Sequence, residues 1–174
     1  MRKMEADCQV TIKGLPEPVA QNLGKAVAVV VKTLGQAGYA LDLRRMHRVV
    51  VTADFAGELS ELSGSTASGN PITYTQEEYA IAVGKVVTLP RDDGDREIVL
   101  VIDARIAAWF APRDGEGGDS DNLQTGLHLL HHELCHIHDT NKMIDAFPSL
   151  LPRERYAGKD ILVRPLAELC WAEY

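Results

Sequence analysis

Residues 123–138 read LQTGLHLLHHELCHIH, and this stretch decides the fold that we expect. Its apolar residues recur at spacings of four, three, four and three, which is the period of an amphipathic helix. Asp121 and Gln124, three residues apart, resemble a capping box at the start of that helix. We therefore expect a long helix to about Asp139, with a buried face formed by Leu123, Leu127, Leu130, Leu134 and Ile137.

Five of the six histidines of the chain lie in this one helix. At about 100° per residue, His132 and His136 fall together on the face opposite the leucines. They belong to the HExxH pattern His132-Glu133-Leu134-Cys135-His136, whose i, i+4 spacing lets two imidazoles share a tetrahedral metal ion. Glu133 projects from the edge of the same face. We predict that His132 and His136 bind Zn²⁺ and that Glu133 is the general base.

The types of residue in this pattern point to hydrolysis. Zinc held by neutral imidazoles stays Lewis-acidic and lowers the pKa of a bound water molecule from ~15.7 towards ~7. A neighbouring carboxylate can take the proton of that water and pass it to a leaving nitrogen. The expected activity is that of a zinc metallopeptidase, and the expected substrate is a peptide or protein.

A catalytic zinc site needs a third protein ligand and an open position for water. Asp139 and His128 each lie one turn from the histidine pair, but ligands strung along a single helix spread too far along its axis. Projected as a helix, residues 163–174 place Glu173 on the same face as Val163, Leu166, Leu169 and Cys170. Burying a carboxylate there is costly unless it is paired or bound to metal, so Glu173 is the favoured third ligand.

The HExxH pattern followed by Trp171-Ala172-Glu173-Tyr174 resembles the gluzincin branch of zinc metallopeptidases, in its compact bacterial and phage-type form. The resemblance implies His132, His136 and Glu173 as metal ligands and Glu133 as base. It also implies a zincin-like α+β fold. In that fold an N-terminal helix and a small mixed sheet pack on the HExxH helix, and a C-terminal helix carries the last ligand.

The rest of the chain fits a single domain over residues 1–174. Helical spacing of Val19, Leu23, Val27, Val30 and Leu34 predicts a first helix over 16–37, stopped by Gly38. A sheet should follow, with strands at 48–52, 80–89 and 98–102, the last an unbroken apolar run. Residues 60–70 and 112–120 have loop composition, and 91–95 suits a hairpin connection.

The composition of the chain limits which binding partners and which cellular compartment we expect. A formal charge of −7 disfavours nucleic acid, because binding phosphate backbones needs a basic face. Three scattered cysteines, Cys8, Cys135 and Cys170, favour a reducing compartment over a disulfide framework. No signal peptide or membrane-spanning run is visible, so we expect a cytoplasmic protein without a membrane partner.

Other residues near the pattern have lesser expected roles. Cys135 is interpreted as a small packing residue rather than a ligand. His131 and His138 are interpreted as structural groups or as supports of the ligands. Either of them, or Tyr156 or Tyr174, is a weaker candidate for stabilising an oxyanion.

Two rival functions stay open at this level. A domain with this pattern could keep zinc and act in regulation or interaction with little or no catalysis, or it could be a metal-free interaction domain. If it is a peptidase, strand 98–102 is the expected border of the cleft, where an extended peptide would add as a further strand.

Overall fold

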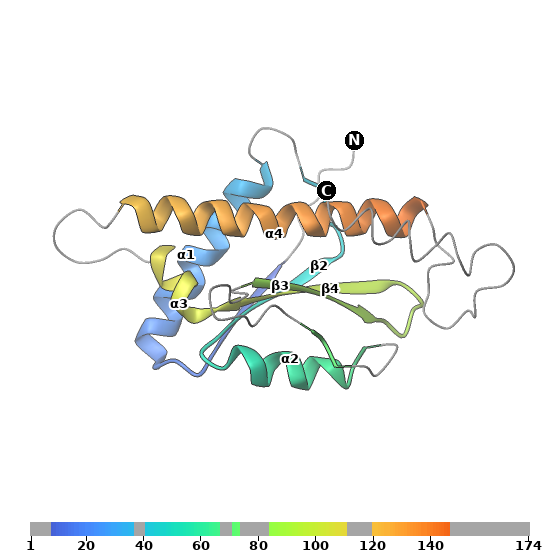
Figure 1. Ribbon diagram of the computed structural model, residues 1–174, viewed down its shortest axis with the longest axis horizontal. Coiled ribbons are helices and arrows are strands. Elements are labelled where there is room, and N and C mark those ends of the chain that lie inside the picture. Colours follow the sequence, from blue (N-terminus) through green and yellow to red (C-terminus); the bar gives the residue numbers. More distant parts are fainter. Residues whose placement is uncertain (1–7, 37–40, 67–70, 74–83, 111–119, 147–174) are drawn as a thin grey trace, which may run out of the picture.

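A computed structural model describes residues 8–36, 41–66, 71–73, 84–110 and 120–146 of the 174-residue chain. The described part is a mixed α+β structure, as expected, with helices packed on a small four-stranded sheet (Figure 1). None of its helices is both long and apolar enough to cross a membrane. The elements in chain order are β1 (Gln9–Lys13), α1 (Glu17–Gln36), β2 (Met46–Thr52), α2 (Phe55–Ser63), β3 (Gly84–Pro90), β4 (Arg96–Asp103), α3 (Ala104–Ala107), a 3-10 turn (Ala108–Phe110) and α4 (Ser120–Ala146).

The sheet has the strand order β1-β2-β4-β3. β1, β2 and β4 run parallel, and β3 pairs antiparallel with β4. The connection between β3 and β4 is a tight hairpin, as predicted: the Arg91 N–H donates to the Asp95 carbonyl at 3.0 Å, and Gly94 has a φ of 84°, which glycine adopts readily. β4 pairs with β2 on one side and with β3 on the other, so the expectation that a peptide adds to 98–102 as a further strand is wrong. β3 lies at an edge of the described sheet.

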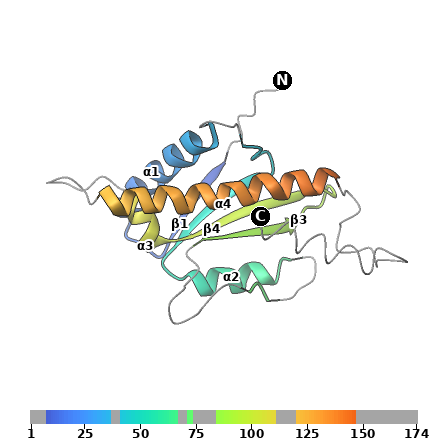
Figure 2. The ribbon, with the colours of Figure 1, turned by 45° about the horizontal axis from the view of Figure 1, so that its top comes forward.

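Both faces of the sheet are covered by helices. α1 and α4 lie on one face and α2 on the other, as the two views show together (Figures 1 and 2). Along β4, Ile98, Leu100 and Ile102 point into the core beneath α1 and α4, whereas Val99 and Val101 point towards α2. A strand buried on both faces needs apolar residues at every position, which explains the unbroken run in the sequence.

The first half of the chain differs from the sequence prediction in three ways. α1 has the predicted extent, but Val19 is 51% exposed and the core is met by Leu23, Val27 and Val31. β1 precedes α1, although a sheet was expected only after the helix. α2 reaches Ser63 and so occupies the start of the stretch predicted as loop, because Phe55, Leu59 and Leu62 bury one face against the sheet.

α4 is longer than predicted. It begins at Ser120, so Asp121 lies inside its first turn rather than capping it, and it continues past Asp139 to Ala146. The polar residues after Asp139 stay helical because Asn141 is fully buried and bonded to the segment before β2. The predicted helix at 163–174 lies outside the described residues.

Candidate metal centre

The apolar side of α4 fixes the orientation of the helix on the sheet. Leu130, Leu134 and Ile137 are buried in the core that α4 shares with α1, as the leucine spacing predicted. Leu123 was predicted to belong to this face but is 43% exposed, because it lies near the helix start. The anchored leucines turn His132 and His136 away from the core.

His132 and His136 face each other one turn apart. Their Nε2 atoms are 2.9 Å apart, and the ring centroids lie at 4.4 Å with the rings nearly perpendicular. At that separation one ring donates its N–H to the other. Two nitrogens on a tetrahedral zinc ion at about 2.0–2.1 Å lie about 3.3 Å apart, so the rings would open by only about 0.4 Å to accept one. The two Nε2 atoms therefore fit the zinc ion that the sequence pattern implies.

Glu133 lies next to this pair, between α4 and the start of β3. Its side chain is half-buried and packs against Gly84. Burial raises the pKa of the Glu133 carboxyl above its ordinary value, and the nearby His136, His132 and Lys85 partly oppose that rise. A carboxylate with a raised pKa is a stronger proton acceptor than an ordinary one, as a general base requires.

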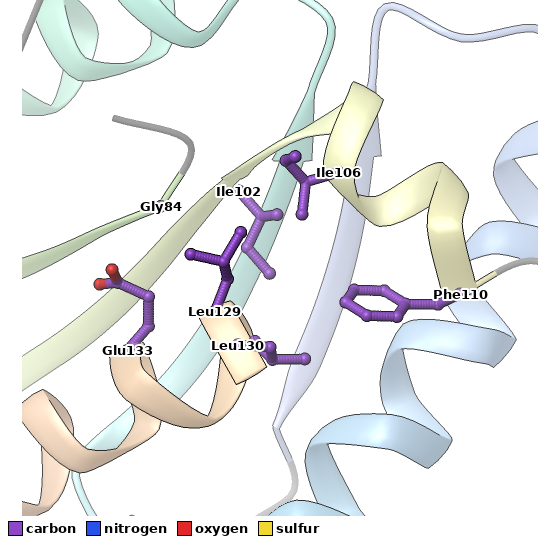
Figure 3. Close-up of a pocket in the computed structure, with 7 residues that line it drawn as sticks. All are labelled: Gly84, Ile102, Ile106, Phe110, Leu129, Leu130 and Glu133. Carbon is purple, nitrogen blue, oxygen red and sulfur yellow. The ribbon is translucent and has the colours of Figure 1, made fainter. Parts of the chain in front are cut away.

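Glu133 also forms the polar end of a small, partly open pocket between α4, the sheet and α3 (Figure 3). In Figure 3 the carboxylate points towards the strand at Gly84, and the apolar side chains occupy the other side. A group bound here would therefore meet one ionisable side chain and otherwise hydrocarbon. The lining residues are Gly84, Ile102, Ile106, Phe110, Leu129, Leu130 and Glu133.

The third ligand is not found within the described ranges. No group of three His, Cys, Asp or Glu side chains there is arranged to hold a metal ion, so neither Asp139 nor His128 joins the pair. Glu173, the favoured third ligand, lies outside the described residues. So do Tyr156 and Tyr174, the weaker candidates for an oxyanion contact.

The remaining histidines of the helix have other neighbours. His138 accepts the backbone N–H of Asp42 at its Nδ1 atom, at 2.7 Å, which is a structural contact. The Nδ1 atom of His131 lies 3.8 Å from the Sγ atom of Cys135. Burial, and secondarily the charge of Asp139, raises the pKa of the Cys135 thiol. Cys135 is only partly buried and is not among the side chains packed on the core, so its packing role stays a prediction.

Two features of the site were missed at the level of sequence. Gly84 contacts Glu133 only because the pairing of β3 with β4 carries it there. Asn141 lies beyond the predicted helix end, and its partners Asp42 and Arg45 are almost a hundred positions away. No local pattern marks either contact.

No family model, curated protein or solved structure matches the chain.

Proposed function

We propose that this chain is a zinc-dependent metallopeptidase of the gluzincin type, with Glu133 as general base. One observation carries the proposal. The Nε2 atoms of His132 and His136 meet at 2.9 Å on the outward side of α4, and the carboxyl between them in sequence is half-buried with a raised pKa. The proposed chemistry requires this combination of two facing imidazoles and a partly buried carboxyl.

The residues would divide the chemistry among them. His132 and His136 would hold the metal through Nε2, and Glu173 is the proposed third ligand. Zinc bound there would polarise a substrate carbonyl and acidify water. Glu133 would accept a proton from that water on a carboxylate oxygen and deliver it to the departing amine nitrogen. Its raised pKa makes the carboxylate a stronger acceptor of the first proton.

The surroundings of Glu133 are compatible with a peptide substrate. β3 is an edge strand of the described sheet, so it replaces β4 as the strand that could pair with an extended peptide. The small pocket beside Glu133 is lined by Ile102, Ile106, Phe110 and two leucines of α4, so an apolar group of a substrate would meet hydrocarbon next to the base. The zincin-like fold is part of the proposal, supported by the mixed sheet and the helix that carries the HExxH pattern.

The test uses the full chain, stripped of metal and reloaded with zinc, on a mixed-sequence quenched-fluorescent peptide library. We expect zinc-dependent cleavage that falls at least about a thousandfold in Glu133→Gln, with the bound zinc unchanged. Glu61→Gln is the matched control, because Glu61 is exposed on α2 on the other side of the sheet. Full activity of Glu133→Gln would exclude the base.

The same experiment separates the rival functions. Zinc bound at one equivalent with no cleavage of any library peptide would favour a regulatory or interaction domain. Failure to bind zinc at all would favour a metal-free interaction domain and end the proposal.

A further inference from the structure

Gly84 is the first residue of β3 and pairs with Ile102 of β4. Ile102 points into the core beneath α4, so position 84 faces that helix too. Among the described glycines only Gly14 and Gly94 have a positive φ. The backbone at position 84 therefore does not require glycine, and the reason for the missing side chain must be space.

That space is taken by Glu133. A Cβ atom built on Gly84 would lie 2.8 Å from Cγ, 3.1 Å from Cδ and 3.3 Å from Oε1 of Glu133. Carbon atoms in favourable contact are about 3.5–4.0 Å apart, so even an alanine would force a movement. The movement falls on the Glu133 side chain, because the flanking Leu130 and Leu134 hold the helix backbone on the sheet.

We propose that Gly84 is a positioning residue for Glu133: by lacking a side chain, it leaves the room in which the methylenes of Glu133 lie, so that the carboxylate stays between the sheet edge and the histidine pair. Any side chain at position 84 turns Glu133 away from this place. The catalytic consequence rests on the proposed function, whereas the contact itself does not.

The first test follows catalysis in the zinc-loaded full chain, using a peptide that the wild type cleaves. Gly84→Ala should lower kcat at least tenfold with KM within twofold and zinc content unchanged, because only the base is misplaced. Gly64→Ala is the matched control, since a Cβ there meets its nearest atom at an ordinary 3.6 Å. An unchanged kcat, or a loss expressed only in KM, would overturn the catalytic role.

The second test needs no activity. In metal-free protein, Gly84→Ala should lower the thermal midpoint by about 1–4 °C in the wild-type background, because the Glu133 side chain must leave its preferred conformation. In a Glu133→Ala background the same change should leave the midpoint unchanged or raise it, because the clash is gone and a flexible glycine has been replaced. Equal shifts in the two backgrounds would overturn the contact.

The two tests fail separately. If the wild type cleaves no peptide, the proposed function has failed, and the two midpoints still decide whether Gly84 makes room for Glu133. If the wild type is active and the midpoints do not couple, the function stands and the role of Gly84 is withdrawn.

Discussion

The two halves of α4 carry the same kinds of side chain in different surroundings. In the N-terminal half, residues 120–136, the side-chain nitrogens of His132 and His136 meet each other on the outward face. In the C-terminal half, residues 137–146, His138 and Asn141 are bonded to the backbone of Asp42. The first half presents two imidazoles to each other, whereas the polar side chains of the second half are bonded to another segment of the chain.

The segment before β2 provides the bonding partners of the C-terminal half of α4. Arg45 donates to the side chains of Asn141 and Asp145 on α4 and to Asp95 in the β3–β4 hairpin. Arg44 adds an ion pair with Asp145. Polar bonds therefore fix the C-terminal half of this histidine-rich helix, whereas the N-terminal half is held by its buried leucines and turns its imidazoles outward.

The largest expected effect concerns the proposed metal ligands in the N-terminal half of α4. His132→Ala should weaken zinc binding at least about 100-fold, because losing a ligand costs more than losing a group that supports one. His128→Ala, one turn earlier on an exposed position, should leave the affinity unchanged. Competition with a chromogenic chelator measures both. Equal losses in the two variants would remove the distinction between the pair and its neighbours.

The next effect is a loss of stability and concerns the C-terminal half of α4. Asn141→Ala removes a fully buried amide that donates to the Asp42 carbonyl at 2.7 Å and accepts from Arg45. We expect the free energy of unfolding to fall by about 2–3 kcal/mol, since buried polar partners are left unsatisfied. Urea denaturation of metal-free protein measures this fall. Lys142→Ala, at the exposed next position, should cost less than about 0.5 kcal/mol. Matching losses would show that the segment does not hold the helix.

A smaller effect is expected for His138, which lies two positions beyond the HExxH pattern. His138→Ala leaves the Asp42 N–H without its acceptor and should cost about 1–2 kcal/mol of stability. Zinc affinity should stay within twofold of wild type. A large loss of zinc binding would mean that the two halves are not independent.

The smallest effect concerns the pH dependence of stability in metal-free protein. Because burial raises the folded-state pKa of Glu133, its protonated form favours folding; this contribution is complete below the ordinary carboxyl pKa and lost as the pH rises through the folded-state pKa. Glu133→Gln is neutral throughout, so its thermal midpoint should rise relative to that of wild type as the pH increases above about 4. A gain that shrinks with rising pH would show that burial is not what sets this pKa.

The sequence could predict those parts of the fold that depend on local periodicity. The buried face of α4 at Leu130, Leu134 and Ile137, the extent of α1 and the apolar strand at 98–102 all agree with it. It missed β1, which has only five residues, and α2, whose serines and glycine resemble a loop. Such short elements form because the sheet offers them a surface, and a local pattern does not record that surface.

The candidate site divides in the same way. The spacing of His132 and His136 is a property of any helix, so the sequence by itself determined that two imidazoles share one face beside Glu133. Only the tertiary structure decided that Glu133 is half-buried against Gly84, that β3 lies at an edge of the described sheet and that His138 is bonded to Asp42. Helical neighbours follow from covalent geometry over four residues, whereas these contacts join segments about 50 to 100 positions apart and depend on the whole sheet being assembled.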